Sequence, residues 1–244
     1  MSARTILITG ASSGIGRATA ELFLEAGWRV GLLARRAHAL DEVAAGRAAA
    51  LALPADVTAA AAVELAFDRF TEWAGRIDVL FNNAGMFGPQ TTIDEVAPEE
   101  WARVLEVNVS GMFLCARAAF ARMRAQDPQG GRIINNGSLS AHSPRPGSIC
   151  YTTTKHAVTG LTKTLSLDGR AFDIACGQID IGNARTPLVE ELAARARAAG
   201  GPVQPTMGVD DAARSVLHMA TMPPGANVQF LTVLATKMPY VGRG

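Results

Sequence analysis

Short apolar segments alternate with longer segments of helical periodicity along most of the chain. The apolar segments are residues 5–9, 29–33, 49–53, 77–81, 132–136, 172–179 and 228–233. Segments this short and this apolar are typical of strands buried on both faces, and their alternation with helical segments predicts parallel β-α-β units. We therefore expect an α/β fold of three layers, in which helices cover both faces of a doubly wound parallel sheet of about seven strands.

The helices that separate these strands are predicted at residues 14–26, 59–74, 98–125, 151–170 and 209–221. In the third of them an apolar stripe, which belongs either to the core or to a subunit interface, contains Trp101, Val104, Leu105, Val109, Met112 and Phe113. The alanine-rich stretch 37–66 keeps a periodicity compatible with helix, and no repeat or linker divides the chain. Residues 1–244 are therefore predicted to form a single domain.

Three segments, 86–97, 137–150 and 182–208, lack a regular pattern, and each follows a predicted strand. We expect them to be loops at the carboxyl ends of the strands, which is the edge where open α/β sheets bind ligands. Substrate specificity should come from these loops. The tail after residue 234 is either a mobile end or a segment docked on another subunit.

Composition narrows the classes of partner. The 23 basic and 22 acidic side chains leave a formal net charge of +1, which gives no field to attract nucleic acid or an anionic membrane. The amino terminus lacks the pattern of an export signal, and no uninterrupted apolar run reaches the roughly 18 residues of a membrane span. The three cysteines and four histidines lack the spacing of a metal site. We expect a cytoplasmic protein that requires no metal and binds neither nucleic acid nor membrane.

A glycine-rich turn follows the first predicted strand. It contains Gly10, Gly14 and Gly16, and a predicted helix begins within it. Glycines at these places let the chain turn tightly, let backbone N–H groups approach a pyrophosphate, and let the helix pack closely on the strand. The turn therefore predicts a dinucleotide site.

The end of the second strand indicates which dinucleotide is bound. A site that prefers NAD(H) usually has an acid there for the ribose 2′-hydroxyl, whereas this chain has Ala34, Arg35 and Arg36. The guanidinium of Arg35 suits a 2′-phosphate, with Arg36 as a second contributor. NADP(H) is therefore expected in preference to NAD(H), the alternative being that both arginines only end a solvated strand.

Tyr151 and Lys155 lie four residues apart at the start of a predicted helix, so they share one face. A free phenol has a pKa of about 10, and a nearby ammonium lowers that pKa by stabilising the phenolate. The pair is suited to proton exchange with a carbonyl or an alcohol.

With these motifs in place, the chain resembles the short-chain dehydrogenase/reductase family from about Thr5 to Val233. Residues 9–16 match the family's TGxxxGxG turn, residues 82–85 match its NNAG segment, and Tyr151 with Lys155 matches its YxxxK pair. The resemblance implies a Rossmann-type fold, hydride transfer between a nicotinamide cofactor and a carbonyl or alcohol, and a homodimer or homotetramer. The substrate would be a small molecule, as for 3-oxoacyl reductases or other ketone reductases.

The resemblance also implies roles for individual residues. Ser138 would donate a hydrogen bond to the substrate oxygen, Tyr151 would exchange the proton, and Lys155 would lower the pKa of Tyr151 and hold the nicotinamide ribose. Asn108 would anchor a water that leads to Lys155. The expected cofactor contacts are Gly10, Ser12, Ser13, Gly14, Ile15, Gly16, Arg35, Arg36, Asp56, Val57, Asn83, Ala84, Gly85, Tyr151, Lys155, Gly182 and Thr186.

Two positions depart from the family pattern. Ile181 stands where a proline usually precedes Gly182, and the pair before Ser138 is Asn136-Gly137. The first change removes a restriction on backbone φ, and the second changes the hydrogen bonding of that turn. Ser140 is an alternative to Ser138.

Alternatives remain open elsewhere as well. Asn108 could serve only to satisfy nearby backbone groups, and either His142 or Arg145 could contact the substrate. A cofactor-binding protein that has lost catalysis, or a scaffold, is the alternative to an enzyme.

Overall fold

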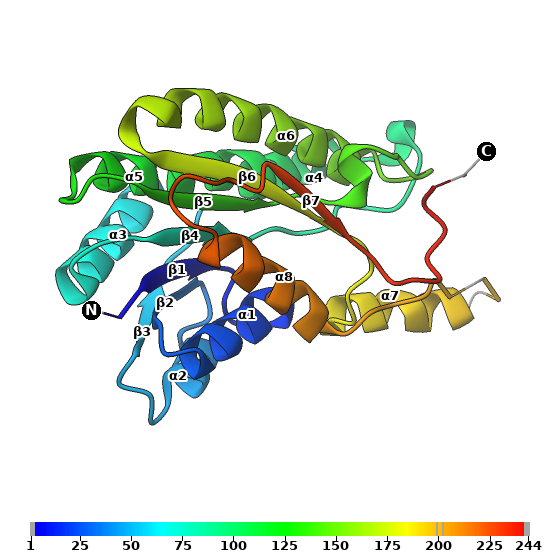
Figure 1. Cartoon of the computed structure of the whole chain (residues 1–244). Helices are drawn as coiled ribbons and strands as arrows, with labels where there is room; N and C mark the ends of the chain where they lie inside the picture. Colours follow the sequence, from blue (N-terminus) through cyan, green and yellow to red (C-terminus); the bar gives the residue numbers. More distant parts are fainter. Residues whose placement is uncertain (1–2, 199, 202, 242–244) are drawn as a thin grey trace.

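The computed structural model describes residues 3–198, 200–201 and 203–241. Within them the strands form one sheet in the order β3-β2-β1-β4-β5-β6-β7, and every neighbouring pair is parallel. The strands are β1 (Thr5–Thr9), β2 (Arg29–Ala34), β3 (Ala50–Pro54), β4 (Val79–Asn82), β5 (Gly131–Asn136), β6 (Ile174–Ile181) and β7 (Phe230–Val233). The predicted doubly wound parallel sheet of seven strands is confirmed (Figure 1).

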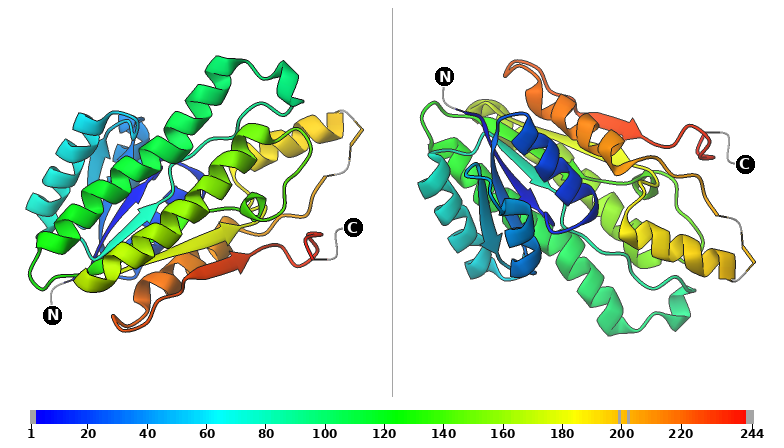
Figure 2. Two further views of the ribbon diagram at one scale, coloured as in Figure 1. Left: turned by 90° about the horizontal axis from the view of Figure 1, so that it is seen from above. Right: turned by 90° about the horizontal axis from the view of Figure 1, so that it is seen from below.

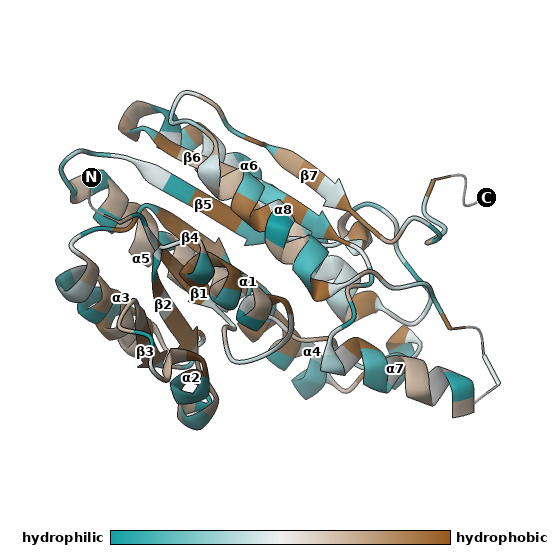
Figure 3. Cartoon of the chain, turned by 60° about the horizontal axis from the view of Figure 1, so that its bottom comes forward, coloured by the Kyte–Doolittle hydropathy of each residue, from teal (hydrophilic) through white to brown (hydrophobic). Residues whose placement is uncertain are grey.

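Helices cover both faces of the sheet (Figures 1 and 2). They are α1 (Gly14–Glu25), α2 (Ala37–Ala44), α3 (Ala60–Ala74), α4 (Pro98–Leu105), α5 (Met112–Ala125), α6 (Ile149–Gly169), α7 (Pro187–Ala198) and α8 (Val209–Thr221). Alternation along β1 explains the layers, because Ile6 and Ile8 pack with α1, α2 and α8, whereas Leu7 packs with α3 and α5. The apolar colour of the central strands in Figure 3 follows from this burial on both faces.

The predicted helix 98–125 is continuous but changes its winding. A π-helical turn at Glu106–Gly111 separates α4 from α5. By length and composition the whole stretch is apolar enough to cross a membrane, a test that core helices of soluble proteins also pass. Val104 and Met112 of the predicted stripe are buried in the core, whereas Phe113 is 49% exposed.

One expectation about the loops is wrong, because segment 182–208 contains α7. Thr186 accepts a hydrogen bond from the N–H of Val189 through its hydroxyl (3.2 Å), and Pro187 is the first helical residue. A threonine cap followed by proline favours the start of a helix. The regular apolar spacing on which the other helices were predicted is weak in this segment.

Candidate active site

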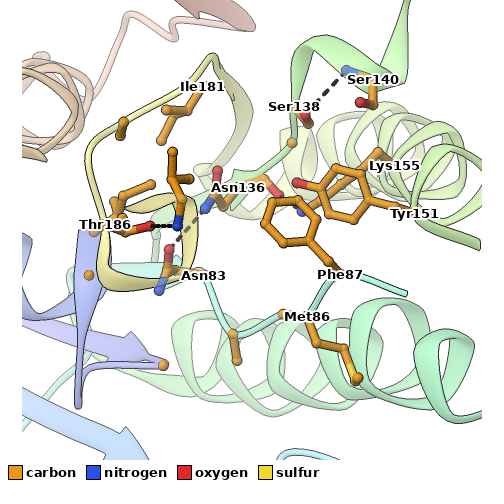
Figure 4. A pocket seen from close by; sticks show the side chains of 18 of the residues that line it. Asn83, Met86, Phe87, Asn136, Ser138, Ser140, Tyr151, Lys155, Ile181 and Thr186 are labelled. Carbon is orange, nitrogen blue, oxygen red and sulfur yellow. Dashed lines mark hydrogen bonds between the residues drawn. The ribbon is translucent and has the colours of Figure 1, made fainter. Parts of the chain in front are cut away.

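A cavity of about 560 Å³ opens at the carboxyl edge of the sheet (Figure 4). Its walls come from the segments that follow β1, β2, β3, β4, β5 and β6, together with the start of α6. This is the edge that the sequence indicated, and its volume is ordinary for a small-molecule site.

The glycine-rich turn forms one end of the cavity. Gly10 and Gly14 have φ values of 67° and 54°, a conformation that side chains with a Cβ rarely adopt. Ser13 caps α1 without a side-chain hydrogen bond, so the first N–H groups of the helix are not satisfied by their own cap. A phosphate group fits this turn, because these N–H groups and the helix dipole favour an anion.

Gly16 has the close-packing role expected for a glycine of this turn. It does not line the cavity, and a Cβ on it would lie 2.3 Å from the carbonyl oxygen of Gly10. Its missing side chain therefore lets α1 pack against the turn, and its expected contact with the cofactor stays a prediction.

The two arginines lie at the same end of the cavity. Arg36 donates a hydrogen bond from Nη2 to the hydroxyl of Ser12 (3.1 Å), and Arg35 lines the cavity near Asp56. Hydrogen bonds from Thr58 lower the pKa of Asp56, and the charge of Arg35 lowers it further. The region therefore holds a charged carboxylate and two guanidinium groups around the place expected for the adenosine.

Hydrogen bonds made by three side chains fix the ends of the central strands. The hydroxyl of Thr9 accepts from the N–H groups of Asn83 (2.8 Å) and Ala84 (2.9 Å), while Nδ2 of Asn83 donates to the Thr9 carbonyl. Asn136 donates from Nδ2 to Oδ1 of Asn83 (2.9 Å), as Figure 4 shows. These contacts join the ends of β1, β4 and β5 below the cavity.

Tyr151, Lys155 and Ser138 meet at the other end of the cavity. The ring of Phe87 lies against that of Tyr151, with centroids 4.6 Å apart, and Nζ of Lys155 is 5.4 Å from the Tyr151 ring centroid. Nζ of Lys155 donates to the carbonyl oxygen of Asn136 (2.7 Å). The start of α6 thus places a phenol and an amine beside the hydroxyl of Ser138 (Figure 4).

Ser138 and Ser140 both line the cavity, but they are not equivalent. The hydroxyl of Ser138 accepts a hydrogen bond from the N–H of Ser140 (3.2 Å) and also forms a hydrogen bond that lowers the pKa of Tyr151. The hydroxyl that acts on the phenol is therefore that of Ser138.

Burial controls the charge of the tyrosine and the lysine. Removal from water raises the pKa of Tyr151, an effect that the Ser138 hydrogen bond and the charge of Arg145 oppose. Burial lowers the pKa of Lys155 to about 8. Desolvation of the phenol is the largest of these effects, and the expected lowering of the Tyr151 pKa by Lys155 stays a prediction.

Asn108 lies in the π-helical turn and does not line the cavity. Its carboxamide holds the backbone of Met86, accepting from the N–H and donating to the carbonyl at 2.8 Å each, and it also donates to the hydroxyl of Thr154 (3.2 Å). Asn108 thus connects the segment of Met86 and Phe87 to α6, next to Lys155. Winding of this kind is often found at functional sites.

Sequence reasoning missed a buried carboxylate beside Ser138. Asp180, with no exposed surface, accepts hydrogen bonds from the N–H of Ser138 (2.9 Å) and from Nε2 of Gln178 (2.7 Å), and it pairs with Nε2 of His142 at 2.8 Å. This network leaves no room for a side chain at position 137, because a Cβ on Gly137 would lie 2.1 Å from Oδ1 of Asp180. Asp180 lies in β6, the strand next to β5, and is 42 residues from Ser138 in sequence, so no local pattern could reveal the contact.

The structure also shows where the two loop residues lie that were expected near the substrate. Arg145 lines the cavity, whereas His142 does not and pairs with Asp180 instead. In the tail, Met238 and Tyr240 line the cavity of their own chain, an arrangement that neither expectation for the tail included.

The remaining expected cofactor residues line the cavity as well: Ile15, Val57, Gly85, Gly182 and Thr186. A Cβ on Gly14 would lie 3.1 Å from Cγ2 of Thr186. The glycine-rich turn and the loop after β6 therefore close around the same space.

Comparison with known proteins identifies the family. Residues 4–197 match the family model described as short chain dehydrogenase. The chain is 33% identical over 197 residues to a 3β-hydroxysteroid dehydrogenase of Mediterraneibacter gnavus, covering 78% of this chain and 70% of that protein. It is 31% identical over 233 residues to a 3-oxoacyl-[acyl-carrier-protein] reductase of Synechocystis, covering 93% of each chain.

Solved structures agree with this assignment. A 3-ketoacyl-(acyl-carrier-protein) reductase of Brucella melitensis, complexed with NADH, superimposes with a TM-score of 0.85 at 29% identity, covering 96% of this chain and 97% of that one. The chain belongs to the short-chain dehydrogenases. It is an oxidoreductase that acts on CH–OH or C=O groups with a nicotinamide cofactor.

Proposed function

We propose that this protein is an NADP(H)-dependent carbonyl reductase in which Tyr151 is the proton donor and Ser138 orients the substrate oxygen. Lys155 assists both of these residues. One observation carries the proposal: the phenol of Tyr151 meets the Ser138 hydroxyl in the same cavity that holds the glycine-rich turn. The cavity can therefore hold a dinucleotide at one end and a carbonyl at the other.

When bound, the nicotinamide supplies the hydride for reduction and accepts it for oxidation. Ser138 donates a hydrogen bond to the carbonyl oxygen, and Tyr151 transfers its phenolic proton to that oxygen as negative charge develops there. The ammonium of Lys155, held by the Asn136 carbonyl, stabilises the phenolate that remains. In alcohol oxidation each proton transfer runs in the opposite direction.

The preference for NADP(H) rests on charge at the end of β2. Ala34 supplies no acid, and Arg35 and Arg36 line the cavity beside the turn. A 2′-phosphate would be attracted there, whereas the 2′-hydroxyl of NAD(H) would find no carboxylate in the usual place. The proposed cofactor contacts are those predicted from the sequence, and Gly16 also acts through packing.

We propose further that residues 1–244 form one cytoplasmic domain that assembles as a homodimer or homotetramer. Exposed apolar side chains on α5 and α6, Phe113 and Leu167, support assembly. The substrate is a ketone or an aldehyde, and the 3-oxoacyl thioesters of two relatives are one candidate class.

Oxidation of NADPH in the presence of a panel of aldehydes, ketones and 3-oxoacyl thioesters tests the proposal. The Tyr151→Phe variant should lose turnover, because it lacks the exchangeable proton, while its affinity for NADPH stays within about threefold of wild type. Tight NADPH binding without turnover of any carbonyl would support a protein that has lost catalysis. Absence of NADPH and NADH binding would support a scaffold.

A further inference from the structure

Two basic side chains line the substrate end of the cavity. Lys155 and Arg145 line this end, and among the described lining residues the only acid is Asp56, at the adenosine end. The charge of buried Asp180 raises the pKa of Lys155, and its carboxylate bonds to Ser138, Gln178 and His142 and, among the described residues, not to Arg145. A carbonyl group alone leaves the charge of Arg145 without a partner.

The backbone of Arg145 is restricted by its neighbours. Pro144 precedes it and Pro146 follows it, and a residue before proline is restricted to extended conformations. The hydroxyl of Ser148 donates to the Arg145 carbonyl (2.7 Å). These contacts hold Arg145 at the cavity wall before any ligand binds, which reduces the entropy lost on binding.

Arg145 is half-buried, and among the described residues its guanidinium lies within ion-pair distance of no carboxylate. By contrast, Arg76 and Arg122 pair with acids on the same chain. Arg145 also lies close enough to Tyr151 for its charge to lower the pKa of the phenol. A free guanidinium on a cavity wall, near the reacting phenol, is suited to bind a carboxylate or a sulfonate through two parallel hydrogen bonds.

We propose that Arg145 forms an oxyanion subsite, and that the preferred substrates carry a carboxylate or sulfonate group as well as the reacting carbonyl. This inference rests on the proposed reductase function, whose substrate it narrows. Arg145 binds the anionic group and so fixes the orientation of the carbonyl between Ser138 and Tyr151.

Matched aldehydes test the subsite. The probes are meta- and para-formylbenzoate, the corresponding formylbenzenesulfonates, and the neutral methyl esters of the two carboxylates. For the wild-type protein, kcat/KM with NADPH should be higher for at least one anion than for its ester. In Arg145→Gln it should fall about 10- to 100-fold more for that anion than for the ester, because the lost charge near Tyr151 affects both substrates alike.

Two further variants separate charge from geometry. Arg145→Lys keeps the charge without the planar fork, so it should restore part of the preference for the anion. Arg170→Gln removes an equal charge from an exposed position just after the carboxyl end of α6. It should leave kcat/KM unchanged for both the anion and the ester. Equal losses for anion and ester in Arg145→Gln, or no preference in the wild type, would overturn the subsite while leaving the reductase function intact.

A binding experiment keeps the test independent of turnover. The alcohol products, meta- and para-(hydroxymethyl)benzoate, cannot react with NADPH, so calorimetry can measure their affinity for the protein with NADPH bound. The affinity of these alcohols should exceed that of their own methyl esters and fall at least tenfold in Arg145→Gln. This result supports the subsite even if no aldehyde is reduced. Affinity that is the same in both proteins contradicts it.

Discussion

At the scale of single residues, the site holds two ionisable groups whose charged forms are disfavoured by burial. The pKa of Tyr151 is raised, so the phenol stays protonated through the neutral range and is ready to act as an acid. The pKa of Lys155 is lowered to about 8, so its charge is lost just above neutrality. Lysine is therefore the group that sets the pH dependence of reduction.

Carbonyl reduction should accordingly fall as the pH rises through about 8. Below that pH the ammonium stabilises the developing phenolate, and above it the neutral amine cannot, while Tyr151 still carries its proton. The rate constant should be measured with deuterated cofactor to verify that hydride transfer limits it.

Lys155→Arg is the control for this pH dependence. Its guanidinium stays charged, so whatever activity remains should lose the decline near pH 8. A decline that persists unchanged in this variant would show that another group titrates.

A second prediction at this scale concerns the two arginines after β2. Arg35→Asp combined with Arg36→Ala should shift the preference from NADP(H) toward NAD(H), because the charge near the 2′-phosphate changes from attractive to repulsive. Dissociation constants for both cofactors measure the shift, with Arg170→Gln as the charge control. If the ratio of the two constants did not change, the arginines would be a solvated strand end only.

At the scale of elements, the ends of β5 and β6 are joined by a buried carboxylate. Asp180 at the end of β6 holds the N–H of Ser138 just after β5, and the space for it exists because residue 137 is glycine. The position of the Ser138 hydroxyl thus depends on a contact between two strands.

Gly137→Ala should therefore lower both stability and turnover. Its Cβ would lie 2.1 Å from Oδ1 of Asp180 and 2.7 Å from Nε2 of Gln178, so the turn must move, at a cost of about 1–3 kcal/mol in the free energy of unfolding. Urea unfolding and NADPH-dependent turnover measure the two effects.

Gly160→Ala is the matched control, because a Cβ there meets no atom within 4 Å in the exposed middle of α6. It should stabilise the protein by about 0.5–1 kcal/mol and leave turnover unchanged. Equal stability of Gly137→Ala and wild type would mean that the Asp180 contact does not constrain this turn.

Sequence predicted the sheet well because its strands are buried on both faces and therefore uniformly apolar. It missed α7, which begins with the polar signal of Thr186 and Pro187 and has few regularly spaced apolar positions. It placed Tyr151 and Lys155 together because four residues on a helix are a local relationship. It could not find the Asp180 network, which joins residues 38 and 42 positions apart, or the raised pKa of Tyr151, which depends on burial in the folded chain.

At the scale of the whole molecule, the cavity links the ends of six strands with α6 and the tail. A ligand that binds there stabilises the folded chain relative to the unfolded one, which has no such site. NADPH at about 100 times its dissociation constant should therefore add about 2.7 kcal/mol to the free energy of unfolding.

Thermal unfolding with NADPH and with NADH at equal concentration measures this linkage. The melting temperature should rise more with NADPH, and the difference should shrink in the double variant of Arg35 and Arg36. Identical shifts for the two cofactors in the wild type would contradict the proposed NADP(H) preference.

Transfer of a labelled hydride tests the proposed chemistry most directly. The protein is incubated with the panel of aldehydes and ketones and with NADPH that carries deuterium at both positions of the transferring carbon of the nicotinamide, and the products are examined by mass spectrometry. We predict an alcohol that carries one deuterium on the former carbonyl carbon, formed by the wild type and not by Tyr151→Phe. Tight NADPH binding with no labelled alcohol from any carbonyl, or equal labelling by the two proteins, would contradict a reductase that uses Tyr151 as its acid.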